Sequence, residues 1–438
     1  MARDSDILVG LDLGTTKITV VVAERITSRP DEAQIICVGE APTRGGIRKG
    51  MIVNLEQAVN SISDAIADAE SALRGLKISR VVVSFSGQKV DCGHVHGKIS
   101  LGKKPRQIGL EDLDEVIENA LSGLELSPET TCIHAIPVTY AVDGNKGIEN
   151  PVEMTGKCLE VDVTTIAVPT SVVMNVVNCV EKAGVRVSGL VVKPLAEALG
   201  TLSKDDREIG ASLVSIGGGT TSVSIFSDGH LIFVGEIAVG GDHITNDILQ
   251  VMKIPLLKAE EIKKQIDLTP GADLSGTIPV ENRGRKQELD KAEIADIISS
   301  RLEELFTNAV LPFIRQLQNN GIPTEVIMTG GVSLSQGIDE FASQFLKVSV
   351  RDGLPVLKDQ MQPGRNDCRY GAACGVIVYL IERLKNPYSY RESPMGEFKD
   401  VAHDKRHSTT TRKRAKRPSE SFSTVIGRSV KELFRELF

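Results

Sequence analysis

The stretch Asp12-Leu13-Gly14-Thr15-Thr16-Lys17 decides the fold, because it joins the apolar run Ile7–Leu13 to the apolar run Ile18–Val22 through a short glycine turn. This pattern predicts two strands joined as a hairpin. Glycine lets the backbone fold tightly and brings several N–H groups close to a phosphate without an obstructing side chain. The neighbouring threonine hydroxyls can donate further hydrogen bonds. The stretch therefore predicts a phosphate-binding hairpin.

The same plan recurs in the second half of the chain. Leu213–Ile216 precedes the turn Gly217-Gly218-Gly219-Thr220-Thr221, and Ser222–Phe226 follows it. A third pair, Gly330-Gly331, follows the strand-like Val326–Met328. One such turn is an ordinary β-hairpin, but two related hairpins with a third turn predict phosphates clamped between two lobes. Because each of the first two turns leads into a strand and not a helix, a Rossmann fingerprint and a P-loop are excluded.

Composition narrows the class of protein. The 438 residues are enough for two or more domains. Trp is absent, aromatic residues make up 4% and the formal net charge is −7, so we expect no nucleic-acid partner. The seven cysteines are scattered and form no C-x-x-C pair, which favours reduced thiols. We find no signal-peptide pattern and no membrane-spanning run, and therefore expect a cytosolic protein.

At this point the sequence resembles the actin, heat-shock chaperone and sugar-kinase superfamily. Asp12–Lys17 is similar to its first phosphate loop, Gly217–Thr221 to the second and Thr329–Val332 to the adenosine loop, while Val192–Ala196 looks like a helix that connects the lobes. The resemblance implies a two-lobed α/β fold with ATP between the lobes. The nucleotide-binding residues that it implies are Asp12, Gly14, Thr15, Thr16, Lys17, Lys193, Gly217, Gly218, Gly219, Thr220, Thr221, Lys263, Lys264, Gly330 and Gly331.

Within that superfamily the chain is similar over nearly its whole length to the FtsA family of bacterial cell division proteins. Gly46–Asn54, Gly147–Pro151 and Gly240–Asp247 are typical of that family. The resemblance implies an actin-like body in which an α+β insert replaces one subdomain. We expect this insert to contain strand-like Val81–Phe85, a helix over residues 110–124 and strand-like Cys132–Tyr140.

The resemblance also implies domain boundaries. We expect a first lobe over 1–83, 170–197 and 370–385, the insert over 84–169, a second lobe over 198–245 and 310–369 with a small subdomain at 246–309, a disordered basic linker over 386–421 and an amphipathic membrane-targeting helix over 422–438. The family uses the insert for self-association and for contact with later division proteins. Its small subdomain binds the acidic C-terminal peptide of FtsZ, the tubulin-like division protein. Arg301, on the helix-like stretch Glu293–Glu304, matches a basic residue used there, although it also fits a solvated helix charge.

The end of the chain has its own chemistry. From Lys405 to Phe438 ten Lys or Arg face three Glu, a net charge of +7, so the preceding residues carry −14. This basic segment suggests anionic lipids as a partner. Apolar residues at three- and four-residue spacing then predict an amphipathic helix. They are Phe422, Val425, Ile426, Val430, Leu433, Phe434, Leu437 and Phe438. Burial of each is worth roughly 1.5 kcal/mol, which favours reversible membrane binding over docking on the body or a coiled coil.

The phosphate site departs from relatives that hydrolyse ATP. Asp12 matches a carboxylate that they use for Mg²⁺, but Ser215 and Ser222 stand at two positions that usually hold Asp. Lys193 stands where an acidic or amide group usually orients water. Because Mg²⁺ needs oxygen ligands and lysine cannot act as a carboxylate base, we expect slow or absent hydrolysis. Lys263 and Lys264 lie on the adenine side by resemblance, in the helix-like run Ala259–Asp267, and by pattern alone they are a solvated pair.

The family resemblance implies an ATP-binding, filament-forming protein on the inner face of the cell membrane at the division site, where it tethers FtsZ filaments. A small-molecule kinase of the same superfamily is an alternative, but Ser215 and Ser222 count against it. An actin-like scaffold of a type IV pilus machine shares these loops but normally lacks a tethered terminal helix. A chaperone would need a long C-terminal domain after Ile381.

Overall fold

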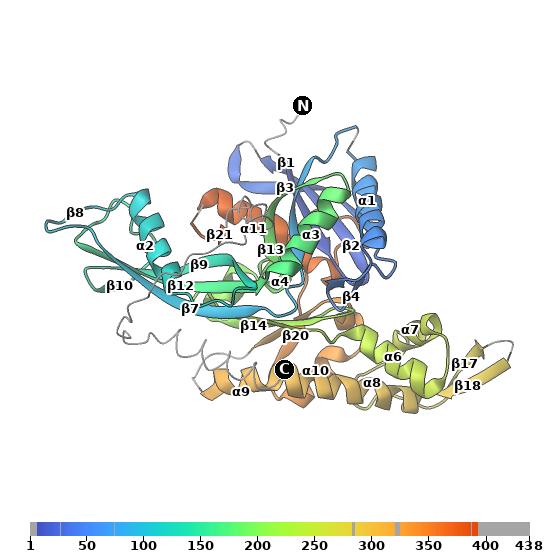
Figure 1. Ribbon diagram of the computed structural model, residues 1–438. Coiled ribbons are helices and arrows are strands. Elements are labelled where there is room, and N and C mark those ends of the chain that lie inside the picture. The colour runs from blue at the N-terminus through green and yellow to red at the C-terminus, as the bar shows by residue number, and fades with distance from the viewer. Residues whose placement is uncertain are drawn as a thin grey trace.

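The computed structural model describes residues 7–392, apart from residues 27, 74, 283–284, 320–324 and 387. It has an upper and a lower lobe in Figure 1, with an arm extending to one side of the upper lobe. Among these residues no helix is long and apolar enough to cross a bilayer. The expected terminal helix at 422–438 and most of the expected linker lie outside the described residues.

The first lobe is built on a five-stranded sheet in the order β13-β6-β1-β2-β3. Its strands are β1 (Ile7–Leu13), β2 (Lys17–Ile26), β3 (Arg29–Pro42), β6 (Arg80–Phe85) and β13 (Arg186–Val192). The first three form an antiparallel meander, and β6 and β13 continue the sheet in parallel. The short hairpin of β4 (Ile47–Arg48) and β5 (Met51–Ile52) follows the meander. The predicted hairpin around Gly14 is therefore confirmed.

Helices cover both faces of this sheet. α1 (Leu55–Ser71) and α3 (Thr170–Lys182) pack on one face, and α11 (Gly371–Lys385) packs on the other. The Asn54 side chain starts α1 by accepting a hydrogen bond from the backbone of Gln57 at 3.1 Å, which satisfies one of the free N–H groups of the first turn.

The arm is an α+β unit, as predicted, but one of its expected strands is misplaced. The main sheet has the order β10-β9-β12-β7 and carries α2 (Leu110–Ser122) on one face. Its strands are β7 (Asp91–Ser100), β9 (Thr130–Val142), β10 (Asn145–Ile148) and β12 (Cys158–Pro169), with β8 (Arg106–Gln107) and β11 (Thr155–Gly156) as a small second sheet. The expectation that Val81–Phe85 belongs to the insert is wrong, because β6 pairs with β1 and β13 in the lobe. Its continuous apolar run suits a strand buried in a parallel sheet.

The second lobe repeats the topology of the first. Its sheet has the order β16-β15-β14-β19-β20, again an antiparallel meander extended by two parallel strands. The strands are β14 (Ala211–Ile216), β15 (Thr221–Ser227), β16 (His230–Ile237), β19 (Val326–Thr329) and β20 (Val350–Asp352). Helices α5 (Lys204–Ile209), α9 (Leu311–Asn319) and α10 (Ile338–Leu346) accompany this lobe. The two glycine turns thus occupy equivalent positions in two like sheets.

A small helical unit extends from the second lobe, at the lower right in Figure 1. It contains α6 (Gly241–Met252), α7 (Leu256–Lys263), α8 (Lys291–Leu305) and the hairpin of β17 (Thr277–Asn282) and β18 (Arg285–Asp290). α8 is the amphipathic helix predicted over residues 293–304, with Ile294, Ile298 and Leu302 buried. The helix predicted over residues 259–267 is α7, and it ends earlier, at Lys263.

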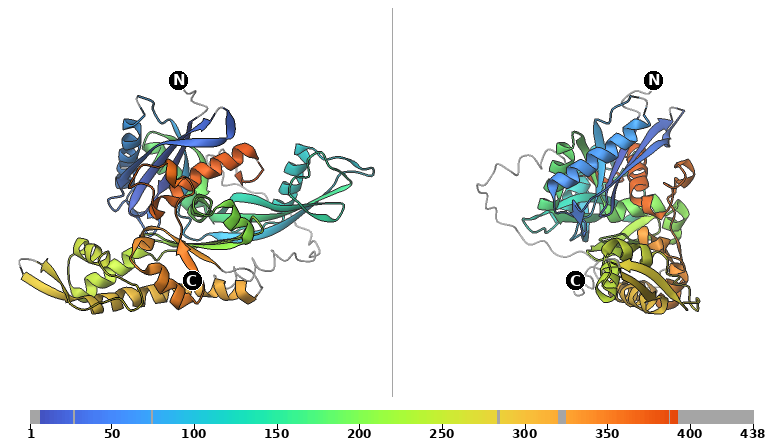
Figure 2. Two further views of the ribbon diagram at one scale, coloured as in Figure 1. Left: turned by 180° about the vertical axis from the view of Figure 1, so that it is seen from behind. Right: turned by 90° about the vertical axis from the view of Figure 1, so that its right-hand side faces the viewer.

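α4 (Lys193–Thr201) and α11 cross between the lobes in close contact. A Cβ atom on Gly375 would lie 1.7 Å from the carbonyl oxygen of Ala196, so only glycine permits this approach. The linker was expected to begin at Asn386, but the chain does not leave the body at that residue. Instead β21 (Arg391–Glu392) pairs with β9 of the arm, and Tyr390 is buried. The left view of Figure 2 shows the molecule from behind, with α11 as the orange-red helix of the upper lobe.

Candidate functional site

The two glycine turns meet where the lobes join. Each is closed by the same hydrogen bond, from Gly14 N to Lys17 O at 3.1 Å and from Gly217 N to Thr220 O at 2.9 Å. Their inner residues face each other. A Cβ atom on Gly218 would lie 2.4 Å from Thr16 Oγ1, so that residue must be small. The structure therefore brings together the two phosphate loops that the sequence predicts.

The start of α6 and the third glycine turn complete this junction. Gly241 N donates to Gly217 O at 2.9 Å and Asp242 N donates to Gly218 O at 2.7 Å, so the first N–H groups of α6 hold the second turn. Val332, which follows Gly330-Gly331, would lie 2.8 Å from a Cβ atom on Gly241. All three predicted turns thus converge on one place.

Asp12, at the end of β1, is paired with Lys193. The Lys193 ammonium lies 3.1 and 3.0 Å from the two Asp12 carboxylate oxygens, and both side chains are nearly buried. Burial alone would lower the pKa of Lys193, but Asp12, Glu197 and Glu236 reverse this and raise it. Asp12, the expected Mg²⁺ ligand, therefore has an ammonium group as its immediate cationic partner.

Glu197, one helical turn after Lys193 on α4, lies at the base of the second turn. It accepts hydrogen bonds from Ser215 Oγ at 2.7 Å and from Ser222 Oγ at 2.6 Å. Burial raises the pKa of Glu197 to about 7, although Lys193 and the two hydroxyls act to lower it. The two serines that replace the usual aspartates thus bind a carboxylate that comes from another element.

Glu236, on β16, connects the second lobe to the first. Its carboxylate accepts hydrogen bonds from Ser86 Oγ at 2.5 Å and from Gly87 N at 2.9 Å, both in the segment after β6. It is 3% exposed, and burial raises its pKa. Asp12, Glu197 and Glu236 therefore form a buried acidic group around the single ammonium of Lys193.

Of three other expected site lysines, one reaches the junction and two bind carboxylates away from it. Lys17 donates to Glu40 at 3.0 Å and lies over the Tyr370 ring, and burial lowers its pKa to about 8. Lys263 reaches the junction, donating to Gly241 O at 3.1 Å and to Thr245. Lys264 is 69% exposed and pairs with Glu260 on the same helix.

Arg301 lies on α8 of the small unit. Its guanidinium binds both carboxylate oxygens of Asp247 on α6, at 2.6 and 3.0 Å, and also Glu304 at 2.6 Å. Its side chain is 27% exposed. It is therefore an accessible cation that is already paired, and not a freely solvated charge.

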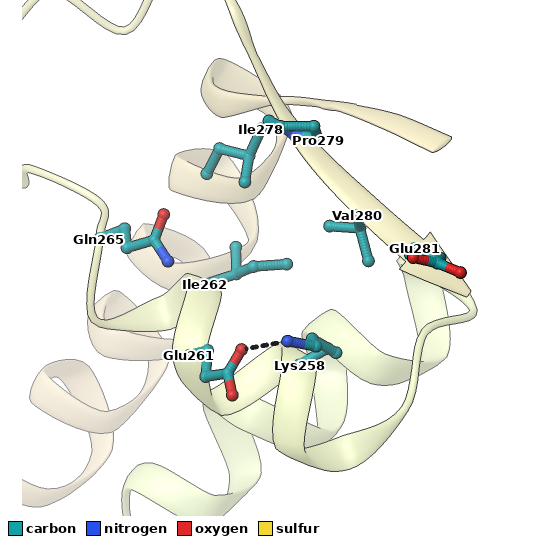
Figure 3. Close-up of a pocket in the computed structure, with 8 residues that line it drawn as sticks. All are labelled: Lys258, Glu261, Ile262, Gln265, Ile278, Pro279, Val280 and Glu281. Atoms are coloured by element: carbon teal, nitrogen blue, oxygen red, sulfur yellow. Dashed lines mark hydrogen bonds and ion pairs between the residues drawn. The ribbon is translucent and has the colours of Figure 1, made fainter. Parts of the chain in front are cut away.

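A cavity of about 380 Å³ lies between α7 with the residues just after it and β17 (Figure 3). Ile262, Ile278 and Val280 line it, and the Lys258–Glu261 ion pair lies at its edge. Lys263 points from the same helix toward Gly241. This cavity is therefore separate from the three glycine turns.

Comparison with known proteins decides the family. The family model described as "Cell division protein FtsA" matches residues 212–375, and the "SHS2 domain inserted in FTSA" matches residues 87–167. The cell division protein FtsA of Borreliella burgdorferi is 34% identical over 385 residues, which cover 87% of this chain and 92% of that protein. The chain belongs to the FtsA family. The FtsA protein of Pseudomonas aeruginosa is 30% identical over 88% of this chain and 92% of its own length.

Solved structures agree with the actin-like fold of this FtsA-family chain. A chain of the PilM–PilN type IV pilus biogenesis complex superposes with a TM-score of 0.61 at 17% identity, covering 85% of this chain and 98% of its own. MreB5 of Spiroplasma citri bound to AMPPNP gives a TM-score of 0.50 at 13% identity, covering 88% and 99%. Identities this low show the fold alone. The family is set by the sequence relatives, which count against the pilus alternative.

Proposed function

We propose that this FtsA-family protein binds ATP between its lobes, assembles with copies of itself and ties FtsZ filaments to the inner face of the cell membrane at the division site. The family membership supports a role in cell division. The observation that carries nucleotide binding is the direct approach of the second glycine turn to the first, at Gly218 and Thr16.

The junction is chemically suited to a polyphosphate. Gly218 and Gly219 carry no Cβ atoms, so the hydroxyl groups of Thr15 and Thr16 come close to the backbone of the second turn. On the third turn the buried Ser333 hydroxyl has no hydrogen-bond partner within the described part of the chain. We assign the triphosphate to the first two turns and the adenosine to the third turn and Lys263. The phosphates of bound ATP would accept hydrogen bonds from the backbone N–H groups and the threonine hydroxyls of these turns.

Slow hydrolysis is part of the proposal. Mg²⁺ prefers oxygen ligands, and among the described residues no group of three His, Cys, Asp or Glu side chains is placed to hold a metal ion. The two hydroxyls beside Asp12 in the sheet, Thr19 and Ser84, are buried and unpaired within that same part of the chain. We therefore propose that Mg²⁺ would be held mainly by phosphate oxygens, with Asp12 as its protein carboxylate, in competition with Lys193.

The partner surfaces are assigned by family. We place the acidic FtsZ peptide on the α6–α8 face around Arg301, and later division proteins and self-association on the arm. The lipid anchor is the apolar stripe at 422–438, outside the described residues. Its apolar residues, together with the net charge of +7 over 405–438, support binding to anionic membranes.

Co-sedimentation with liposomes tests the tether. The full chain is expected to pellet with vesicles that contain anionic lipid and to bring FtsZ with it, whereas a chain ending at Ser421 stays in solution. A matched pair of point variants distinguishes membrane binding by the apolar stripe from membrane binding by charge alone. Phe434→Ser is expected to reduce pelleting, and Glu432→Ser, on the polar side, to preserve it. Equal pelleting of the full and shortened chains would refute the anchor.

Nucleotide binding is tested separately by isothermal titration with ATP and by phosphate release. We expect saturable binding with little phosphate release per hour. Rapid Mg²⁺-dependent release would contradict the proposed slow hydrolysis. No binding of ATP at all would contradict the assignment of the glycine turns.

A further inference from the structure

The carboxylate at the base of the second glycine turn comes from an unexpected element. Ser215 and Ser222 are direct partners across the β14–β15 hairpin, on the two strands that enter and leave the turn. Each hydroxyl donates to a different oxygen of Glu197. One carboxylate on α4 thus holds both strands of the hairpin immediately below the phosphate turn.

α4 is held firmly enough to transmit this constraint. Leu195, Ala196 and Ala198, which flank Glu197 on the helix, are fully buried. A third hydrogen bond between the hairpin and α4 runs from Ser224 Oγ on β15 to Pro194 O at 2.9 Å, one turn earlier on the helix. Because buried helices in close-packed interiors move as units, the position of the hairpin follows that of the helix.

The same helix also reaches the first turn. Lys193, one helical turn before Glu197, binds Asp12, which lies two residues before Gly14. α4 therefore contacts the base of each phosphate turn through a charged side chain. The Lys193 ammonium contacts the first turn, and the Glu197 carboxylate contacts the second. The spacing of the two turns depends on both contacts.

We propose that Glu197 is a positioning residue for the phosphate site. Glu197 and Ser215 form one unit that needs a single carboxylate, and either residue 197 or residue 215 can carry it. This rests on the proposed binding of ATP at the two turns. Aspartate at position 215 would bring a carboxylate toward the place of Glu197 from the strand side. Ser222, directly opposite on β15, can then donate to it. With the carboxylate at position 197 or at position 215, the unit holds one carboxylate and has the same net charge. Two carboxylates, or none, change that charge.

The test is a double-mutant cycle in the full chain, with ATP affinity measured by titration well below the unfolding temperature. Glu197→Ser and Ser215→Asp are each expected to weaken ATP binding on the order of tenfold. The first removes the carboxylate, and the second places two side by side. The double variant is expected to bind within about threefold of the parent. Rescue of ATP affinity is the deciding readout, because a loss caused only by a cavity at position 197 would persist in the double variant.

Each outcome decides something. If the effects of the two substitutions simply add, or if Glu197→Ser leaves ATP affinity unchanged, the exchange is refuted. If Glu197→Ser does not fold, Glu197→Gln, which keeps the shape without the charge, takes its place in the cycle. If the parent protein itself does not bind ATP, the proposed function fails. The exchange is then judged on the unfolding temperatures of the same four proteins, in which the double variant must again exceed both single variants.

Discussion

The ammonium of Lys193 lies at 3.0 to 3.1 Å from both carboxylate oxygens of Asp12, which joins the first residue of the connecting helix to the end of β1. The same ammonium also acts electrostatically on the buried carboxylates of Glu197 and Glu236. Removing one partner of a buried pair leaves an uncompensated charge, which costs far more than the pair itself contributes.

Lys193→Met is therefore expected to lower the free energy of unfolding by about 3 kcal/mol, measured by urea denaturation at neutral pH. The matched control is Lys98→Met, which breaks the exposed pair with Glu160 on the arm and is expected to leave stability unchanged. Equal losses in the two variants would show that burial of the Lys193 pair has no energetic importance.

The raised pKa of Glu197 makes stability depend on pH. The ordinary value is 4.5 and the folded value is about 7, so between these values the folded protein holds a proton that the unfolded chain releases. The contribution of Glu197 is therefore fully present below about pH 4.5 and is lost as the pH rises to about 7, a change of at most about 3 kcal/mol. Glu197→Gln is expected to flatten this part of the profile. Parallel urea-denaturation profiles for parent and variant from about pH 5 to about pH 8 would contradict it.

The sequence predicted the fold more completely than it predicted the site. The glycine turns were found because the same strand-turn-strand pattern occurs twice with a third turn, and this repetition implied two lobes. The placement of Val81–Phe85 failed, because a buried parallel strand has no pattern that tells which sheet it joins. The short strand β21 carries no signal at all, since two residues are too few for periodicity.

Glu197 and Glu236 were missed for a different reason. Neither belongs to a motif, and an isolated Glu in a sequence is most often solvated. The one available signal was the occurrence of two serines at positions that usually carry carboxylates, which implied lost charge. The structure shows that the Ser215 hydroxyl binds a carboxylate from α4. That partner is 18 residues away along the chain, so only the packed helix reveals the contact.

The contacts of Glu236 with Ser86 and Gly87 indicate that this residue helps to hold the two lobes together. Glu236→Ala leaves the Ser86 hydroxyl and the Gly87 N–H without their acceptor, which is expected to cost about 2 to 3 kcal/mol. Hydrogen exchange is expected to increase at Gly87 and its neighbours before it does in the arm. Ser86→Ala removes only one of the donors to Glu236 and should cost less. Unchanged exchange at Gly87 in Glu236→Ala would show that this contact does not hold the lobes together.

The approach of the two turns predicts that Gly219 cannot be enlarged. A Cβ atom there would lie 2.6 Å from Thr15 Oγ1 and 2.9 Å from the backbone nitrogen of Lys49, which has no freedom to rotate away. Gly219→Ala is therefore expected to cost about 1 to 3 kcal/mol and to weaken ATP binding. Gly331→Ala is the control for stability, because no atom lies within 4 Å of its Cβ position. Unfolding temperatures of the two variants make the comparison, and equal values would contradict the close contact.

Arg301 predicts a competition on the small unit. Its guanidinium is bound to Asp247 and Glu304, so an acidic peptide must displace these carboxylates before it can pair with the arginine. Arg301→Ala is expected to weaken binding of the acidic FtsZ peptide on the order of tenfold, because a charge-assisted contact is lost. Asp247→Asn is expected to strengthen binding by about threefold, because a competing charge is removed at a partly exposed site. Fluorescence anisotropy with a labelled peptide at low salt measures both. If Asp247→Asn weakens binding as much as Arg301→Ala does, Arg301 acts by holding α8 against α6 and does not contact the peptide.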